Sequence, residues 1–394
     1  MNWRKSAYLV VTVLFIAGTL FQLQVARGNW EQRGIEVVQD SPAAGTPMEE
    51  EHEEDHKDQQ SEKEQPPVPG TSEEQVTPPS LPTSPSLPKR IVLGYYSSTG
   101  FKPSSNEFLV KYGNLTDVAF QWYGVNAQGD ITTEQSDGGF AAAKSKGVRT
   151  QVSVASTDRE MLHQLLSSES ARSNFVNNAV NLVQRNGCQV FNLDFESLRP
   201  EDKDNYNALL SGLSTALKQK GAAFFVAVPA IEKPVSWRAA FSLADIGRYA
   251  DRVVLMTYDY HYRTGPPGPI APYDWVVRVV SHTKKYIPAN KLILGLGVYG
   301  RDWPQGENGK ALTFDDAEQL AASLGITPNY GAPYYVPNFK YTDQSGVIHQ
   351  VWYENRESLK KKIDLARSQG LGGVAIWRMG YGFPGFWEDI GVYK

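Results

Sequence analysis

Three polar side chains alternate with apolar ones between Val190 and Glu196. They are Asn192, Asp194 and Glu196, in the order Val-Phe-Asn-Leu-Asp-Phe-Glu. Because successive side chains of a β-strand point to opposite faces, an extended chain would place all three on one face. Burying two carboxylates there is costly unless they have partners. The row therefore indicates a chemical role, although an ion-paired or helix-capping cluster at a strand end is the alternative interpretation.

General acid catalysis is the chemistry that the two carboxyl groups fit best. Cleavage of a glycosidic bond needs an acid at the leaving oxygen and a second group at the anomeric carbon. Asp194 and Glu196 point the same way, which is poor geometry for a nucleophile opposite an acid. A close carboxylate instead raises the pKa of its neighbour, since like charges resist joint ionisation. We therefore expect Glu196 to be the acid and Asp194 to tune it, with a nucleophile from elsewhere, most simply from the substrate.

The elements that would position this row recur in a regular order from residue 91. Apolar, β-branched runs alternate with longer helical patterns, and helix-ending glycines precede several of the runs. This alternation predicts an α/β fold with a buried parallel sheet. Eight such strands over about 300 residues predict a (β/α)8 TIM barrel, with a doubly wound open sheet as the alternative. The expected strands are Ile91–Tyr96, Val118–Tyr123, Arg149–Ala155, Gln189–Asp194, Ala223–Pro229, Arg252–Tyr258, Leu292–Val298 and Gly373–Trp377.

The interval between the seventh and eighth expected strands breaks this rhythm. Within it, Tyr334–Tyr341 and Val347–Glu354 flank the turn-forming residues 343–346, Asp-Gln-Ser-Gly. Two strand-like runs around such a turn predict a β-hairpin. We therefore expect a small α+β insertion at about residues 304–356, between strand seven and its helix, at the C-terminal mouth of the barrel.

Aromatic and polar side chains gather at the expected C-terminal ends of the strands, where barrel enzymes have their active sites. A pyranose ring stacks on aromatic rings while its hydroxyl groups need polar partners, so this lining is typical of a sugar site. Each aromatic residue taken alone fits core packing equally well. The candidates for substrate binding are Trp377, Asn192, Tyr96, Trp122, Met256, Asp259, Tyr299 and Arg301, with Tyr258 beside them.

The first 90 residues differ from the rest in composition. Arg4 and Lys5 precede an apolar run from Ala7 to Phe21, which predicts an export signal within residues 1–30. The signal is either a cleaved signal peptide or, if uncleaved, a signal-anchor helix crossing the membrane through residues 7–26, with a buried core helix as the remaining alternative. Basic residues before the run would leave the rest of the chain outside the cell.

Residues 31–90 are acidic and rich in proline and serine, which predicts a disordered linker. Their 14 acidic and 5 basic residues give −9, and residues 1–30 give +3, so residues 91–394 carry +2 of the total −4. A nearly neutral folded part argues against nucleic acid as a partner. The single cysteine, Cys188, excludes an intrachain disulfide. For an exported chain, this fits a bacterial surface protein, which we expect to be a monomer.

The strand that ends at Glu196 resembles the signature strand of glycoside hydrolase family 18, the chitinase-like family, whose motif ends Asp-x-Asp-x-Glu. Other stretches are similar to the motifs of that family on strands one, six, seven and eight, and they occur in the same order. The resemblance covers roughly residues 91–394 as a catalytic barrel. The similar stretches are Leu93–Tyr96, Met256–Asp259, Tyr299–Arg301 and Gly372–Trp377.

This resemblance implies a substrate-assisted, retaining hydrolysis of N-acetylhexosamine glycans without a metal or organic cofactor. Glu196 would protonate the glycosidic oxygen while the 2-acetamido carbonyl of the substrate attacks the anomeric carbon. Asp194 would orient the acetamide N–H and stabilise the oxazolinium ion. Tyr258 would hydrogen-bond the acetamide oxygen, and Trp377 would form the floor under the reacting sugar.

Two departures from the family motif bear on the substrate. Asn192 and Gln189 stand where the motif has aspartates, and residues 153–156 replace a double-glycine pattern. The asparagine version, together with Pro272 and Trp275, resembles the bacterial branch that acts on spore-cortex or cell-wall peptidoglycan. We therefore expect an N-acetylglucosaminidase at the bacterial cell surface, acting on peptidoglycan or, as the next choice, on chitin-type oligosaccharides.

Two alternative functions also fit the sequence. A non-catalytic glycan-binding or scaffold protein of the same fold is the first, and the retained Glu196 argues against it. Transglycosylation with little hydrolysis is the second, and it depends on the access of water to the site.

Overall fold

The computed structural model describes residues 87–98, 104–133, 137–383 and 385–394. The export segment expected in residues 1–30 lies outside these residues, as does nearly all of the linker expected in residues 31–90. Within the described ranges, no helix is both long enough and apolar enough to cross a membrane.

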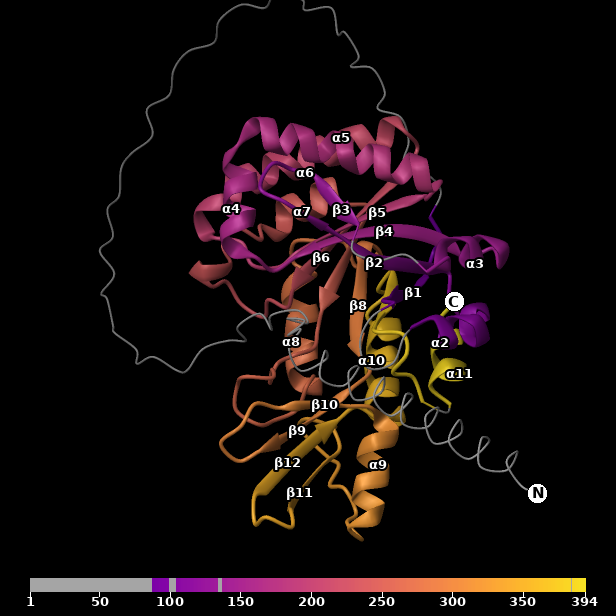
Figure 1. Ribbon diagram of the computed structural model, residues 1–394, viewed down its shortest axis with the longest axis vertical. Coiled ribbons are helices and arrows are strands. Elements are labelled where there is room, and N and C mark those ends of the chain that lie inside the picture. The colour runs from indigo at the N-terminus through magenta and orange to yellow at the C-terminus, as the bar shows by residue number, and fades with distance from the viewer. Residues whose placement is uncertain (1–86, 99–103, 134–136, 384) are drawn as a thin grey trace, which may run out of the picture. The chain divides into compact units, whose positions relative to one another are not determined.

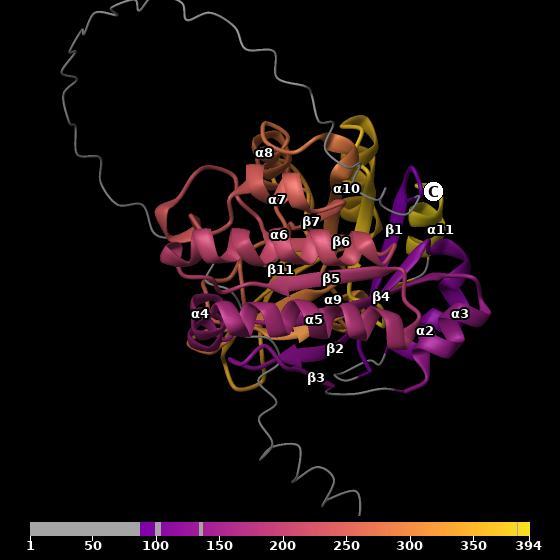
Figure 2. The same ribbon diagram turned by 90° about the horizontal axis from the view of Figure 1, so that it is seen from above.

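Eight parallel strands close into a barrel, as predicted, and several of them are labelled in Figures 1 and 2. Each strand pairs in parallel with the next around the ring, and β13 pairs with β1 to close it. All eight expected runs form these strands, with ends that differ by up to two residues. In order around the barrel they are β1 (Ile91–Tyr96), β2 (Asp117–Val125), β4 (Arg149–Ser156), β5 (Val190–Phe195), β6 (Ala223–Pro229), β7 (Arg252–Met256), β8 (Leu292–Gly297) and β13 (Gly373–Trp377). The short strand β3 (Ile131–Thr133) adds to β2 in the antiparallel sense.

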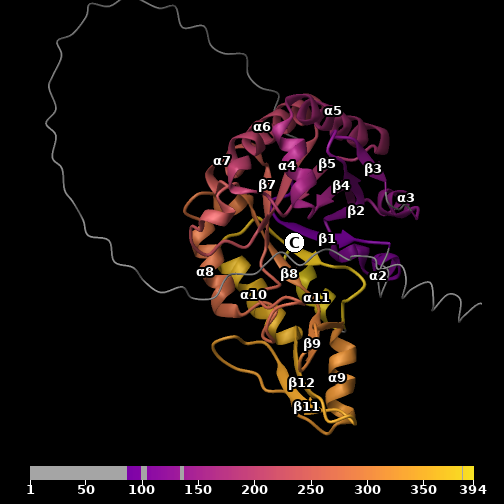
Figure 3. The same ribbon diagram turned by 60° about the vertical axis from the view of Figure 1, so that its left-hand side comes forward.

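Helices cover the outside of the strands, and α5, α6, α7 and α8 follow one another around the barrel in Figure 3. The continuous helical pattern of residues 158–186 in the sequence forms two helices, because Ser168 is extended and its hydroxyl group accepts from Ala171 N to begin α5. The helices are α2 (Ser104–Lys111), α3 (Gly139–Ser145), α4 (Arg159–Ser167), α5 (Glu169–Asn186), α6 (Lys203–Gln219), α7 (Leu243–Tyr249), α8 (Tyr273–Thr283), α10 (Arg356–Ser368) and α11 (Phe386–Gly391).

The side chains of the strands form two separate apolar layers. Along β1, Val92 and Tyr96 pack outward against the helices, whereas Ile91, Leu93 and Tyr95 point into the barrel. This is the period of two that a strand imposes on its side chains. Burial on both sides explains why the strands read as continuous apolar runs in the sequence.

The insertion between β8 and α10 is a four-stranded antiparallel sheet with one helix, as predicted. Its hairpin turns at Asp343, whose Oδ1 accepts from Ser345 N and Val347 N, both at 2.9 Å. The helix packs on the sheet around Ala317, Phe339 and Tyr353. In sheet order the elements are β10 (Lys310–Leu312), β9 (Gly300–Pro304), β12 (Ile348–Tyr353) and β11 (Asn338–Thr342), with helix α9 (Phe314–Ser323).

Candidate active site

Strand β5 carries the polar row inside the barrel. Asn192 is fully buried and Asp194 is 4% exposed, while Glu196 follows the last residue of the strand and is partly exposed. The intervening Phe191 and Leu193 pack outward against the helices. The backbone of Glu196 is held by a 3.0 Å hydrogen bond from its N–H to Ser156 O at the end of β4. The predicted alternation therefore leaves one carboxyl group deep in the barrel and one at its mouth.

Asp194 is held from two neighbouring strands. Gln121 on β2 donates from Nε2 to Asp194 Oδ2 at 3.0 Å, and Ser153 on β4 donates to Gln121 Oε1 at 2.6 Å. Burial raises the pKa of Asp194 from its ordinary value of 3.8 to about 6, and the hydrogen bond from Gln121 offsets only part of this rise. Asp194 can therefore gain or lose a proton near neutral pH.

Asn192 precedes Asp194 by two residues on the same face of β5 and contacts side chains of β1 and β4. Its Nδ2 lies 3.3 Å from the hydroxyl oxygen of Tyr95 and 3.1 Å from Gln151 Oε1. Burial, and then the negative charge of Asp194, raise the pKa of the Tyr95 phenol. Tyr95 thus stays protonated, and its ring packs edge-on against Trp377 with centroids 5.6 Å apart.

Trp377 and Tyr258 form a stacked pair beside the carboxyl groups. Their ring planes differ by 12° and their centroids lie 6.4 Å apart. Two glycines of β8 leave room for Tyr258. A Cβ at Gly295 would lie 3.0 Å from the Tyr258 ring and 2.3 Å from Leu255 O, and a Cβ at Gly297 would lie 3.0 Å from Tyr258 Cβ. Burial raises the pKa of Tyr258 well above its usual range, so its hydroxyl group remains a hydrogen-bond donor.

Asp259 and Arg301 form an ion pair at the same end of the barrel. Arg301 donates from Nη2 to Asp259 Oδ1 at 2.8 Å, and the side chain of Arg301 is 9% exposed. Asp259 has a φ of 55°, the left-handed conformation that aspartate tolerates better than most residues. Tyr299 packs with Trp303 and the partly buried Trp352 of the insertion, beside Trp377. The insertion thus contributes to the wall of the mouth.

Two residues of the expected sugar site lie elsewhere than predicted. Tyr96 and Trp122 are buried in the outer layer, where the Tyr96 hydroxyl group donates to Asp137 Oδ2 at 2.8 Å and Trp122 Nε1 donates to Ser98 Oγ at 2.8 Å. Met256, by contrast, is partly exposed at the end of β7 and packs, like Trp377, against the inner apolar layer. Tyr96 and Trp122 were misplaced because their positions on the strands have the outward parity.

Tyr95, Gln121 and Ser153 lie near the C-terminal ends of the expected strands but were assigned no role from the sequence, although they hold Asn192 and Asp194. The alternation along β1 and β2 was the signal that could have given Tyr95 and Gln121 a role, because both share the inward parity of their strands. In the part of the chain that the structure describes, no group of three or more His, Cys, Asp or Glu side chains could hold a metal ion.

The site therefore combines two carboxyl groups on one strand with an aromatic floor and a tyrosine hydroxyl group. Such a site can donate a proton from one side of a sugar whose ring stacks on Trp377.

Comparisons with known proteins agree with this geometry. The family model described as "Glycosyl hydrolases family 18" matches residues 91–382. The putative sporulation-specific glycosylase YdhD of Bacillus subtilis is 30% identical over 279 residues, which are 67% of this chain and 66% of YdhD. The cortical fragment-lytic enzyme of Bacillus cereus is 30% identical over 248 residues, which are 61% of this chain and 58% of that enzyme.

Two solved structures are also similar. The spore cortex-lytic enzyme SleL of Bacillus megaterium has a TM-score of 0.72 and 28% identity, covering 78% of this chain and 75% of that one. A chitinase of Chromobacterium violaceum has a TM-score of 0.72 and 28% identity, covering 77% of this chain and 99% of that one. From its family match, its relatives and its site, this chain belongs to the glycosyl hydrolases of family 18 and is a glycosidase.

Proposed function

We propose that this chain hydrolyses N-acetylglucosaminyl linkages of peptidoglycan by a retaining, substrate-assisted mechanism, with Glu196 as the general acid and base. The observation that carries this proposal is the placement of Asp194 and Glu196 on the same face of β5, one buried and one at the mouth. A retaining enzyme with two carboxylates needs its nucleophile on the opposite side of the anomeric carbon from its acid. Asp194 does not fit that position, so the nucleophile comes from elsewhere, and the resemblance to family 18 implies that it is the 2-acetamido carbonyl oxygen of the substrate.

In the first step, the sugar lies on Trp377 and Glu196 gives its proton to the glycosidic oxygen. The bond between that oxygen and the anomeric carbon breaks as the acetamido carbonyl oxygen bonds to the anomeric carbon. Ionised Asp194 accepts from the acetamide N–H and stabilises the positive charge of the oxazolinium ion, and Tyr258 donates to the acetamide oxygen. In the second step, water attacks the anomeric carbon, the bond from that carbon to the acetamido oxygen breaks and Glu196 takes the proton of the water, so two inversions leave the configuration retained.

The environment of Asp194 supports this division of roles. A carboxyl group with a pKa of about 6 is buried at low cost while it is protonated, and above that pH it releases its proton to solvent, so the ionised form is present to stabilise the positive charge that forms beside it. The hydroxyl group of Tyr258 stays protonated, so it can donate throughout the reaction.

Peptidoglycan is favoured over chitin for two reasons. YdhD is named as sporulation-specific, and the cortical fragment-lytic enzyme and SleL are named for their action on the spore cortex. Asn192 also replaces the aspartate of the family motif, as in the branch acting on the bacterial wall. The similarity to a chitinase makes chitin-type oligosaccharides the second candidate substrate. We also propose that the enzyme works outside the cell membrane, because its substrate lies there and an apolar run from Ala7 to Phe21 follows basic residues.

Product analysis tests this proposal. The full chain is incubated with purified peptidoglycan and, in parallel, with N-acetylglucosamine oligomers, and the products are identified by mass spectrometry. We expect reducing-end N-acetylglucosamine from peptidoglycan. Products from the oligomers alone would reassign the substrate to chitin, and binding without products from either would indicate a glycan-binding protein.

The role of Glu196 is tested by Glu196→Gln, with Glu201→Gln as the matched control at an exposed position five residues further on. An amide cannot donate a proton to the leaving group, so turnover should fall by about 10²–10⁴-fold while glycan binding remains. The control should keep wild-type turnover. Turnover of Glu196→Gln within a few-fold of wild type would show that another group is the acid.

A further inference from the structure

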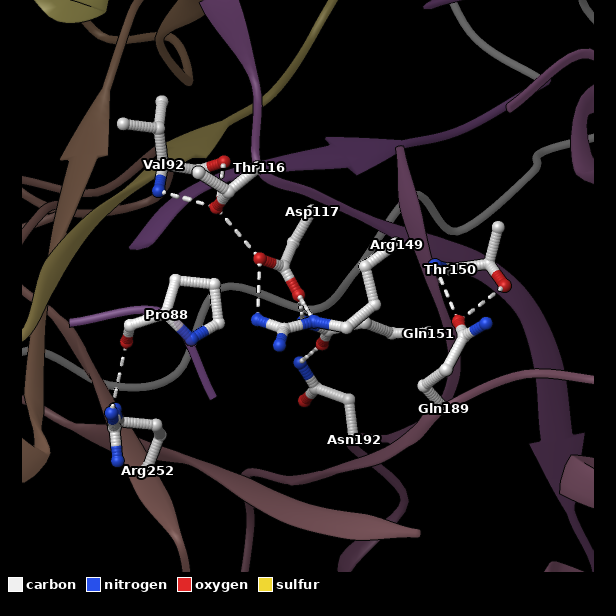
Figure 4. A network of polar contacts seen from close by, with 10 residues as sticks. All are labelled: Pro88, Val92, Thr116, Asp117, Arg149, Thr150, Gln151, Gln189, Asn192 and Arg252. Carbon is white, nitrogen blue, oxygen red and sulfur yellow. Dashed lines mark hydrogen bonds and ion pairs between the residues drawn. The ribbon is translucent and has the colours of Figure 1, made fainter. Parts of the chain in front are cut away.

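A chain of buried polar side chains runs through the barrel from the start of β2 to the middle of β5 (Figure 4). We call the residues Arg149, Asp117, Gln151 and Asn192 the buried polar chain. Arg149 donates to both oxygens of Asp117, at 2.6 and 2.8 Å, and Gln151 Nε2 donates to Asp117 Oδ1 at 2.9 Å. Asn192 Nδ2 then donates to Gln151 Oε1 at 3.1 Å. Asp117, Gln151 and Asn192 are fully buried.

The charge of Asp117 fixes the direction of every hydrogen bond in this chain. An ionised carboxylate only accepts, and Asp117 accepts from Arg149, from Thr116 Oγ1 at 2.7 Å and from Gln151. Gln151 must therefore turn its NH2 group toward Asp117 and its carbonyl oxygen toward Asn192. Asn192 must in turn present its NH2 group to Gln151, which leaves its carbonyl oxygen directed away from the chain.

In the described part of the chain, two buried oxygen atoms of β5 have no donor. Asn192 Oδ1 and Asp194 Oδ1 have no hydrogen-bond partner among the described residues. They belong to residues two apart on one strand, so their side chains share a face. An unpaired buried acceptor is costly, and a proton on Asp194 that is donated to Asn192 Oδ1 would satisfy both oxygens.

We propose that Asp117 and Gln151 are positioning residues, which hold the carbonyl oxygen of Asn192 toward Asp194 so that it accepts from the protonated carboxyl group. Asn192 has no proton of its own to share in this contact, because its NH2 group is committed to Gln151 and Tyr95. The functional consequence of this contact rests on the proposed function. In that function, the buried polar chain sets the pH at which Asp194 becomes ionised.

The other titratable groups around Asp194 do not obscure a measurement of how this contact affects the titration of Asp194. The flanking strands β4 and β6 carry amide, hydroxyl and apolar side chains beside the face of β5 that bears Asp194. The nearby tyrosines have pKa values raised mainly by burial, so they stay neutral near pH 7. The titratable neighbours are Glu196 just after β5 on the same face, Tyr95 on β1, Tyr206 on α6, Tyr258 after β7, and Asp259, which is paired with Arg301.

The test measures the titration of Asp194 directly, in the full chain carrying Glu196→Gln so that Glu196 does not titrate. Carboxyl ¹³C NMR of aspartate-labelled protein follows Asp194, whose signal is assigned by its loss in Asp194→Asn. Gln151→Met keeps the volume of the side chain but removes both hydrogen bonds. Thr150→Val is the matched control, because Thr150 is also fully buried on β4 and bonds to Gln189 on the outer side.

We expect Gln151→Met to lower the pKa of Asp194 by about half to one pH unit, since the protonated form loses its fixed acceptor. Thr150→Val should leave the titration unchanged. Asp117→Asn is the second variant, because an amide at position 117 no longer dictates the orientation of Gln151, and it should lower the pKa in the same direction. In the chain with Glu196 intact, the acidic limb of kcat/KM should move to lower pH by the same amount.

An unchanged Asp194 titration in either folded variant would overturn the proposal, as would an equal change in Thr150→Val. The NMR measurement needs no substrate, so failure of the wild-type enzyme to cleave glycans would count against the proposed function alone.

Discussion

Replacing Asp194 by asparagine should make the protein more stable at neutral pH while it abolishes efficient turnover. The carboxyl group is 4% exposed and its pKa is raised to about 6, so ionised Asp194 is a destabilising group in the folded protein. An asparagine at this position can still accept from Gln121 and can donate to Asn192 Oδ1, which has no donor among the described residues. It has the same shape and carries no charge at any pH.

The size of the effect follows from the change in pKa. The folded protein binds the proton of Asp194 more tightly than the unfolded chain, in which the pKa is close to 3.8. The contribution of Asp194 to stability is thus fully present below pH 3.8 and is lost as the pH rises through about 6. The difference of about two pH units corresponds to about 3 kcal/mol. Asp194→Asn should therefore match wild type near pH 4 and exceed its free energy of unfolding by up to about 3 kcal/mol at pH 7.5.

Urea unfolding followed by tryptophan fluorescence at several values between pH 4 and 8 measures this difference. Asp364→Asn is the control, because Asp364 lies in an exposed pair with Lys360 and its loss should change stability by less than about 0.5 kcal/mol. A difference between Asp194→Asn and wild type that stays constant over this pH range would refute the reasoning. So would an asparagine variant that is less stable than wild type at pH 7.5.

Two further predictions concern the aromatic floor and the junction of the insertion with the barrel. Tyr258→Phe should lower kcat by about 100-fold with little change in KM, since the ring still stacks on Trp377 but the donor to the acetamide oxygen is lost; unchanged kcat in steady-state kinetics would contradict this role. In the wild-type protein Glu354 is fully buried, and its Oε2 lies 2.5 Å from Lys362 Nζ. Lys362→Met should destabilise the protein by about 3–5 kcal/mol, because it leaves this buried carboxylate without its cationic partner. The double variant with Glu354→Gln should recover most of that loss in urea unfolding, and additive effects of the two changes would speak against the pair.

Local patterns in the sequence predicted the elements of this fold well. Continuous apolar runs identified the eight strands, because strands buried on both faces need apolar side chains in both directions. The turn at Asp343 identified the hairpin of the insertion, since its side chain caps the turn locally. The boundaries of the helices were predicted less accurately than the strands. Ser168 shows the reason, because a cap residue can begin a new helix inside a continuous helical pattern.

The positions of the expected site residues followed from the sequence along the single strand β5, but not where several strands meet. Tyr96 and Trp122 were expected at the mouth because they lie near strand ends, yet the parity of their positions directs them outward. Gln121 and Ser153 hold Asp194, but nothing local in the sequence connects them with a residue on β5.

The sequence by itself determined that Asn192, Asp194 and Glu196 share one face of a strand, because the period of two is a property of the extended chain. Only the tertiary structure decided that this face lies inside a closed barrel, where burial raises the pKa of Asp194. It also decided that Asp117 and Gln151 join Asn192. These contacts depend on the register between neighbouring parallel strands, which is set when the barrel closes and its two apolar layers pack.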